Sequence, residues 1–188
     1  MLRITTGIAK GKALKTLDGD ATRPTSERIK QAIFSSIQFD VEEKRVLDLF
    51  AGSGQMGLEA ISRGASSVTF IDLAREAMDI VKDNSRKCGF FDKCRYLVSD
   101  WKNYIRKASN KDRYDLVFID PPYALECAED AVRRLEGANM LAGGAIVVAE
   151  CGSEDFRPER LASFEVLKSE RYGKMTFINI LLYRGEEK

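Results

Sequence analysis

Arg45-Val-Leu-Asp-Leu-Phe-Ala-Gly-Ser-Gly-Gln-Met-Gly-Leu-Glu-Ala60 is the stretch that decides the fold. An apolar run at 46–50 leads into a turn of small residues at 51–54, and apolar residues then recur at helical spacing. This order predicts a strand, a tight glycine turn and a helix. Residues 52–57 match G-x-G-x-x-G, in which glycines let backbone amides approach a ligand beside the free N–H groups of a helix start. The same turn can also serve simple strand-to-helix packing.

A second carboxylate strengthens the ligand-binding interpretation. The β-branched and aromatic run at 67–71 ends at Asp72, which lies 20 residues after Gly52. At this spacing an acid at the end of the second strand binds a pair of ribose hydroxyls. The alternative is a solvated turn aspartate. The pattern predicts an adenosine-like ligand, either a nicotinamide cofactor or S-adenosylmethionine.

Asp48 helps to separate these two ligands. A charge within a buried strand is costly unless it is paired or used. A carboxylate near the glycine turn would repel a pyrophosphate, whereas S-adenosylmethionine has no phosphate and carries a sulfonium and an ammonium group. Asp48 therefore favours S-adenosylmethionine.

Composition limits the possible classes of protein. The chain has 188 residues, of which 44% are hydrophobic, enough for one core with a small extension. We expect a basic arm or hairpin at 1–24 and a single compact domain at 25–188. With no apolar run of membrane-spanning length and no signal-like start, we expect a cytoplasmic protein with no membrane partner.

Histidine and cysteine usage excludes several chemistries. There is no histidine, which rules out Ser-His and Cys-His catalysis and histidine-containing metal sites. The four cysteines show neither C-x-x-C pairing nor metal-ligand spacing. We therefore expect reduced thiols and no bound metal.

Charge is unevenly distributed along the chain. Residues 1–30 hold seven basic and three acidic side chains, a net +4, whereas the whole chain carries only +1. A basic arm on a mildly acidic body suggests a polyanionic partner at one edge. An ordinary solvated surface explains the same charges equally well.

The remaining chain alternates strands with helices. We expect strands at 94–98, 114–119 and 145–149, helices near 74–88, 101–108 and 126–138, a glycine turn at 143–144, and a closing antiparallel pair at 164–168 and 176–183 around a loop at 171–174. This order predicts an α/β fold with a doubly wound, mostly parallel, Rossmann-like sheet. Ligands of such sheets bind at the carboxyl edge of the strands.

A further pair of residues lies at that predicted edge. Asp100 and Trp101 follow the strand at 94–98 and could bracket an adenine ring, although Asp100 could equally cap the next helix.

The tetrapeptide Asp120-Pro121-Pro122-Tyr123 follows a nearly all-apolar strand. The prolines make the turn rigid, and together the carboxylate, the Pro121 carbonyl and the tyrosine ring form a slot for a flat group that bears an NH₂. A purely structural proline turn is the alternative.

These motifs resemble those of a known family. Asp120-Pro-Pro-Tyr123 looks like the (D/N/S)-P-P-(Y/F/W) motif of methyltransferases that act on exocyclic amines. Residues 46–60 and 62–65, with Thr22-Arg23-Pro24-Thr25 and Gly7-x-x-Lys10-Gly11-Lys12, resemble the RsmD family, which methylates N2 of a guanine in bacterial 16S ribosomal RNA. The resemblance covers essentially the whole chain. It departs at Leu73-Ala74, where the family usually has a further polar or acidic residue.

The resemblance implies a class I S-adenosylmethionine-dependent methyltransferase. Its cofactor-binding residues would be Asp48, Phe50, Ala51, Gly52, Ser53, Gly54, Asp72, Leu73, Asp100 and Trp101. Asp120, Pro121, Pro122 and Tyr123 would hold the target guanine amine, and Lys10, Lys12 and Arg23 would contact RNA. The expected partner is ribosomal RNA or the small ribosomal subunit, and a monomer is favoured. A DNA amino-methyltransferase and a nucleotide-binding domain without methyltransferase activity remain alternatives.

Overall fold

The computed structural model describes residues 2–17, 27–122, 125, 127–152, 156–173 and 175–185. The chain forms two compact units, Met1–Trp101 and Lys102–Lys188.

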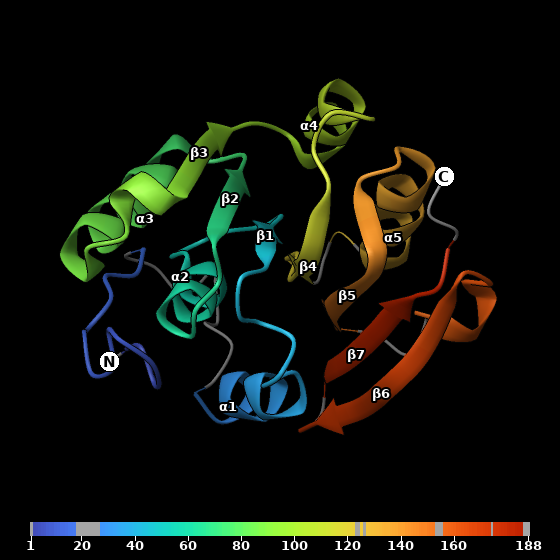
Figure 1. Ribbon diagram of the computed structural model, residues 1–188, viewed down its shortest axis with the longest axis horizontal. Helices are drawn as coiled ribbons and strands as arrows, with labels where there is room; N and C mark the ends of the chain where they lie inside the picture. The colour runs from blue at the N-terminus through green and yellow to red at the C-terminus, as the bar shows by residue number, and fades with distance from the viewer. Residues whose placement is uncertain are drawn as a thin grey trace. The chain divides into compact units, whose positions relative to one another are not determined.

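The first unit contains three parallel strands, β1 (Arg45–Asp48), β2 (Ser67–Asp72) and β3 (Cys94–Val98), in the order β3-β2-β1. Helix α2 (Gln55–Ser62) connects β1 to β2, and α3 (Arg75–Cys88) with the short 3₁₀ helix η1 (Phe91–Lys93) connects β2 to β3 (Figure 1). Because the strands are parallel, their carboxyl ends lie at one edge, as the sequence predicts.

Helix α2 packs closely on β2 because residue 57 is a glycine. A Cβ atom at Gly57 would lie 2.4 Å from the Phe70 ring and 2.8 Å from Val68 Cγ1. The predicted strand–turn–helix unit is therefore confirmed, and its third glycine brings the helix backbone against the strand.

The N-terminal segment packs on this unit. Residues 2–17 form a hairpin-like turn with a single antiparallel bridge, Arg3 to Ala13. Apolar side chains on the segment are buried, among them Ile4 and Leu14. A Cβ at Gly7 would lie 1.7 Å from the Ser62 carbonyl oxygen at the end of α2, which shows how closely the two backbones approach.

Helix α1 (Glu27–Ser36) supplies a buried cation to the same region. Ile33, Phe34 and Lys30 of this helix are buried, whereas Ser36 is exposed. The Lys30 ammonium lies 3.1 Å from a carboxylate oxygen of Glu59 on α2, and neither side chain is exposed.

Glu59 also receives hydrogen bonds from the N-terminal segment and from its own helix. Its carboxylate accepts from the Thr5 amide (2.8 Å), the Thr5 hydroxyl (2.7 Å), the Thr6 amide (3.0 Å) and Arg63 Nε (3.0 Å). Lys30 donates a further hydrogen bond to the carbonyl of Arg3 (2.6 Å). One buried carboxylate thus joins α1, α2 and the N-terminal segment.

The second unit continues the alternation. Helix α4 (Trp101–Ala108) runs on from the first unit, followed by β4 (Tyr114–Ile119), α5 (Ala128–Gly137), β5 (Leu141–Cys151), η3 (Pro158–Arg160), β6 (Phe164–Tyr172) and β7 (Thr176–Tyr183). Strands β4 and β5 are parallel, and β7 pairs antiparallel with both β5 and β6 (Figure 1). The predicted α/β class and its C-terminal antiparallel pair are confirmed.

Two strands are longer than the sequence indicates. Gly143 and Gly144 do not form a turn before β5 but lie inside it, because the register shifts between Tyr114 and Leu116 and β5 accommodates extra residues there. Strand β6 reaches Tyr172, which pairs with Thr176, so the expected loop is reduced to a tight turn around Gly173. Helix α5 begins at Ala128, two residues later than predicted.

Within the described part of the chain, no helix combines the length and the apolar character that a bilayer crossing requires.

Candidate functional site

The glycine turn between β1 and α2 has an open face. The Ala51 amide donates to the carbonyl of Ile71 (2.9 Å), and the Gly54 amide donates to the carbonyl of Ala51 (2.7 Å), which fixes the turn on β2. Gly52 has a positive φ of 53°, and a Cβ built on it would meet nothing within 4 Å. The turn therefore leaves room for a ligand beside its backbone.

Asp72, at the end of β2, holds this turn in place. Its Oδ2 accepts from the Gly52 amide (2.9 Å), and its Oδ1 accepts from the Ala74 amide (2.8 Å). The side chain is half-buried, and a carboxylate can accept about four hydrogen bonds. Asp72 keeps acceptor capacity for a ligand after bracing the turn.

Asp48 is the last residue of β1, is only 3% exposed, and its side chain reaches the start of α2. Its Oδ2 accepts from the Gly57 amide (3.0 Å), one of the N–H groups that a helix start leaves unpaired, since the capping residue Gly54 has no side chain. Burial raises the pKa of Asp48 from 3.8 to about 7; the Gly57 hydrogen bond opposes that rise and the negative charge of Asp72 adds to it. A cationic ligand nearby would favour the ionised carboxylate.

Gln55, the first residue of α2, was missed by the sequence analysis. It is 6% exposed, and within the described residues its Oε1 is a buried side-chain oxygen without a hydrogen-bond donor. Buried acceptors almost always have partners, so this oxygen points to a donor from outside the described residues, such as a bound ligand. The available signal was a polar side chain among small and apolar residues at a helix start.

Two exposed apolar side chains flank Asp72. Leu73 is 72% exposed, and Val98, which pairs with Asp72 across the β2–β3 ladder, is 46% exposed. The Ser99 amide donates to the Asp72 carbonyl (2.9 Å) and fixes this arrangement. Leu73 was predicted as a site residue and Val98 was not; together they offer apolar surface beside the acid.

The aromatic residues of the predicted site pack against each other. The Trp101 ring lies 6.0 Å from the Phe50 ring at an interplanar angle of 52°, and Trp101 is only 8% exposed. Asp100, directly before it, is half-buried. Trp101 is therefore mainly a packing residue behind the turn, whereas Asp100 keeps part of its surface accessible.

Asn84 on α3 supports the turn from behind. It is fully buried, and its Nδ2 donates to the carbonyls of Ser53 (2.9 Å) and Lys15 (3.0 Å), while its Oδ1 accepts from the Lys15 amide (2.8 Å). The N-terminal segment and the glycine turn thus share one buried amide.

The segment after β4, which we call the proline corner (Asp120, Pro121 and Pro122), is partly accessible to solvent. Asp120 is half-buried directly after β4, Pro121 is buried and Pro122 is exposed. The Leu125 amide donates to the Pro122 carbonyl (2.9 Å). Tyr123 lies outside the described residues.

The predicted RNA-contacting residues differ in their surroundings. Lys10 is exposed; Lys12 is exposed too, but its ammonium donates to the Lys87 carbonyl at the end of α3 (2.9 Å). Arg23 lies outside the described residues.

Across the described ranges, no group of three or more His, Cys, Asp or Glu side chains is arranged to hold a metal ion.

Comparison with solved structures identifies the fold. The solved structure of yhhF from Escherichia coli matches 98% of this chain and 99% of its own, with a TM-score of 0.88 and 26% identity. The fold is that of a Rossmann-like class I S-adenosylmethionine-dependent methyltransferase.

Sequence comparison identifies the family. The chain belongs to the RsmD family, described as "Conserved hypothetical protein 95", which matches residues 2–181. It is 32% identical to Ribosomal RNA small subunit methyltransferase D of Haemophilus influenzae over 151 residues, 79% of this chain and 78% of that protein. It is 31% identical to YlbH of Bacillus subtilis over 185 residues, 98% of this chain and all of that protein.

Proposed function

We propose that this protein transfers a methyl group from S-adenosylmethionine to the exocyclic N2 amine of a guanine in 16S ribosomal RNA. The similarity to a ribosomal RNA small subunit methyltransferase supports the substrate class. Two buried groups near the start of α2 carry the proposal: the Gln55 Oε1 acceptor, for which the described residues supply no donor, and the Asp48 carboxyl, whose pKa is raised.

These residues fit S-adenosylmethionine better than a pyrophosphate cofactor. An ammonium group could donate to Gln55 Oε1, and positive charge would favour ionised Asp48. Asp72 would accept from ribose hydroxyls, and Leu73 and Val98 would provide apolar surface for an adenine ring. A phosphate here would meet the buried carboxyl of Asp48 and the half-buried carboxylate of Asp72, which would repel it, so the residues favour the sulfonium compound.

The bound cofactor would supply an electrophilic methyl group on a sulfonium. The protein's part is to hold the target amine. In this proposal the two N–H groups of the guanine amine donate hydrogen bonds, one to the Asp120 carboxylate and one to the Pro121 carbonyl. Tyr123 stacks on the base. Orientation of this kind can lower an activation barrier by on the order of 7–11 kcal/mol, so no strong base is required.

The target base has to be accessible to this corner. A guanine inside an RNA helix is stacked and paired, so we propose that the substrate guanine is looped out or flipped. Lys10, Lys12 and Arg23 would contact RNA phosphates near the N-terminal segment. The proposed partner is ribosomal RNA or the small ribosomal subunit.

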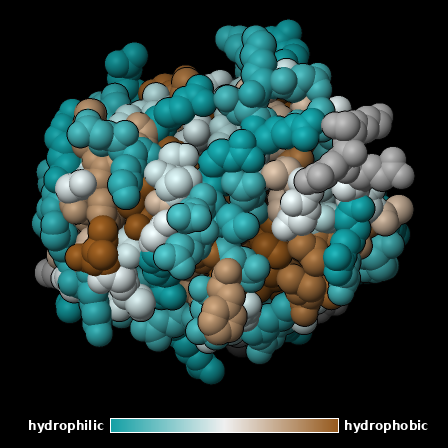
Figure 2. All heavy atoms as spheres, viewed as in Figure 1, coloured by the Kyte–Doolittle hydropathy of each residue, from teal (hydrophilic) through white to brown (hydrophobic). Residues whose placement is uncertain are grey.

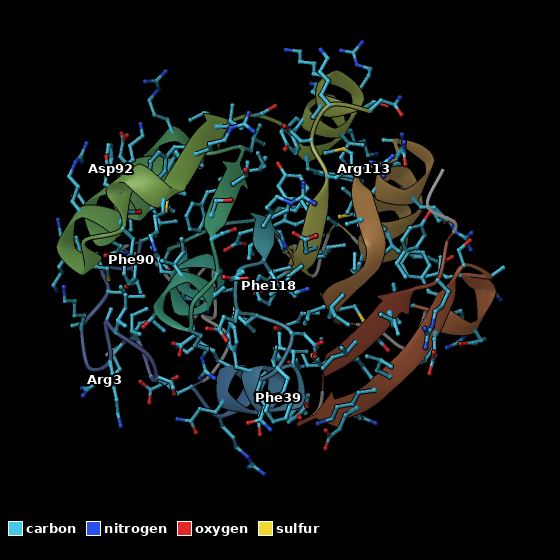
Figure 3. All side chains as sticks on the ribbon, in the orientation of Figure 1. Arg3, Phe39, Phe90, Asp92, Arg113 and Phe118 are labelled. Carbon is cyan, nitrogen blue, oxygen red and sulfur yellow. The ribbon has the colours of Figure 1, made fainter. Side chains whose placement is uncertain are left out.

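Substitution of Asp120 tests the assignment. We expect Asp120→Ala to lower methyl transfer at least 100-fold, because the amine loses a charged acceptor, while the Kd for S-adenosylhomocysteine changes less than twofold. Tritiated-methyl transfer to 16S RNA, small subunits and DNA measures the first quantity, and calorimetry measures the second. Asp92→Ala, an exposed acid on η1, is the matched control (Figure 3).

The outcomes separate the candidate functions. Equal loss of transfer and of cofactor binding in Asp120→Ala would contradict the role of the proline corner. Transfer to DNA in preference to RNA would favour the DNA amino-methyltransferase, and binding of NADH in place of S-adenosylhomocysteine would favour a nucleotide-binding domain.

A further inference from the structure

A second basic cluster lies in the second unit, far in sequence from the N-terminal segment. Residues 102–113 hold five basic side chains and one acidic side chain, a net +4 in twelve residues of a chain whose total charge is +1. The five are Lys102, Arg106, Lys107, Lys111 and Arg113. Outside this cluster and residues 1–30, the chain carries a net −7. The positive charge is therefore concentrated in two places.

Helix α4 presents one face of this cluster to solvent. Tyr104 and Ile105 are buried, and the Tyr104 hydroxyl hydrogen-bonds the Tyr114 hydroxyl at the start of β4. Arg106 and Lys107 are exposed on the opposite side, and hydrophilic side chains cover α4 in Figure 2. The helix is thus held on β4 by its apolar face while its basic face stays accessible.

The turn after α4 is fixed in place. The Asn110 amide donates to the Ala138 carbonyl at the end of α5 (3.0 Å), and Ser109 Oγ donates to the same carbonyl (3.2 Å). The Asn139 side-chain amide donates to Asn110 Oδ1 (3.1 Å). Lys111 follows directly, so its backbone is held by α5.

The basic side chains of this cluster and those of neighbouring α5 differ in their ion pairs with acidic side chains. On α5, Arg133 lies 2.8 Å from Glu129, and Arg134 lies 2.8 Å from Asp130. Lys102 also lies within reach of Asp130, at 3.7 Å. Within the ranges that the structure describes, no ion pair with an acidic side chain is found for Arg106 and Lys107 on α4 or for Lys111 and Arg113 after it.

We name Arg106, Lys107, Lys111 and Arg113 the α4 basic face; Arg113 lies beside the end of α4 in Figure 3. We infer that this face binds phosphates of the RNA substrate, away from the base being methylated. The inference rests on the proposed function for its substrate class. Clustered cations on a surface, in excess over the one acid among them, Asp112, are the electrostatic footprint of a nucleic-acid partner.

The position of the face indicates which part of the RNA it meets. Arg113 directly precedes β4 and Asp120 directly follows it, so their backbones lie about 20 Å apart at roughly 3.3 Å per strand residue. A nucleotide held at Asp120 is too small to span that distance. The α4 basic face would therefore contact phosphates remote from the target guanine, and only a large folded RNA would reach both.

Salt-dependent RNA binding without cofactor tests the inference. The variant Arg106→Gln/Lys107→Gln/Lys111→Gln/Arg113→Gln should bind 16S RNA at least 10-fold more weakly at low salt. Its plot of log affinity against log salt should be less steep by about 3, since each phosphate contact contributes roughly 0.7–0.9 to the slope. Its Kd for S-adenosylhomocysteine should match that of the wild type.

Matched variants separate a local contact from general charge loss or misfolding. Arg133→Gln/Arg134→Gln removes two charges from α5, as Arg106→Gln/Lys107→Gln does from α4, and only the α4 pair should weaken RNA binding. Arg106→Lys/Lys107→Arg keeps the charge and should keep the affinity. Circular dichroism melting of every variant confirms that the fold is retained.

Two results would overturn the inference: equal RNA affinity and salt slope in the fourfold variant and the wild type, or equal weakening by the α4 and α5 pairs. Neither would affect the proposed methyl transfer, which is measured separately. If the wild type methylated no RNA but its RNA binding still depended on the α4 basic face, the proposed function would fail and the phosphate contact would stand.

Discussion

Glu59 and Asp48 are two buried carboxylates of the first unit whose pKa values shift in opposite directions. Burial pushes the pKa of Glu59 up, but the Thr5 amide, the Lys30 ammonium and the Thr5 hydroxyl outweigh it, and the pKa falls below 4.5. Asp48 receives one hydrogen bond, from Gly57, and its pKa rises to about 7.

The difference shows what each acid is for. Glu59 is paired with a cation and hydrogen-bonded on both oxygens, so the folded chain itself stabilises its charge. Asp48 lies beside the glycine turn with its charge poorly compensated, and a cationic ligand would supply what the chain omits. One carboxylate holds the fold together, and we propose that the other is kept for the cofactor.

The largest expected effect comes from breaking the paired acid. We expect Glu59→Ala to lower the free energy of unfolding by about 3–5 kcal/mol, because it leaves the fully buried Lys30 ammonium without its carboxylate. Urea denaturation measures this loss. The double variant Glu59→Leu/Lys30→Met should lose much less, since it removes both charges. A loss below about 1 kcal/mol in the single variant would show that Lys30 finds another partner.

The pH dependence of stability should distinguish the two acids. The pKa of Asp48 in the folded state, about 7, lies above its ordinary value of 3.8, so the folded chain keeps a proton there that the unfolded chain releases. The stability this group contributes is fully present below pH 3.8 and is lost as the pH rises through 7. Between pH 5 and 7 the wild type should lose about 2 kcal/mol relative to Asp48→Asn.

Glu59 contributes a pH dependence of stability with the opposite sign. Its pKa is lowered in the folded state, so its contribution is present above 4.5 and is lost as the pH falls through the folded-state value. It adds no slope between pH 5 and 7. Unfolding free energies of wild type and Asp48→Asn measured across this range provide the test, and parallel curves would refute the raised pKa of Asp48.

The smallest effect concerns ligand affinity. We expect Asp48→Asn, which keeps the size and an acceptor for the Gly57 amide, to weaken S-adenosylhomocysteine binding at pH 8 about 10-fold, or about 1.4 kcal/mol. The reason is the loss of the negative charge that would face the cofactor's ammonium. Calorimetry measures the Kd, with Asp92→Asn as the control. Unchanged affinity would mean that Asp48 serves only to cap α2.

The sequence reveals the parts of this protein that are governed by local rules. The strand–turn–helix order around Gly52, the spacing to Asp72 and the closing antiparallel pair were all predictable, because glycine turns and apolar periodicity reflect the needs of the backbone nearby. The assignment of Leu73 and Asp120 as ligand-binding residues stays a prediction.

Other features depend on contacts between distant segments. The burial of Lys30 depends on Glu59, 29 residues further on, and on the Arg3 carbonyl. The missing donor of Gln55 and the glycines inside β5 likewise arise from tertiary packing and strand register. No local pattern encodes these contacts, so the sequence alone does not distinguish Lys30 from the other basic residues at 1–30, and it predicts a turn at Gly143–Gly144.

The buried amide of Asn84 has a practical consequence. Because its side chain hydrogen-bonds the main chain at Lys15 and at Ser53 together, residues 2–17 support the glycine turn that we propose binds the cofactor. Trimming them to improve crystals would leave that amide half unsatisfied and loosen the loop itself. Purification handles are therefore better fused to the carboxyl terminus, and titrations with truncated protein would understate the affinity of the intact one.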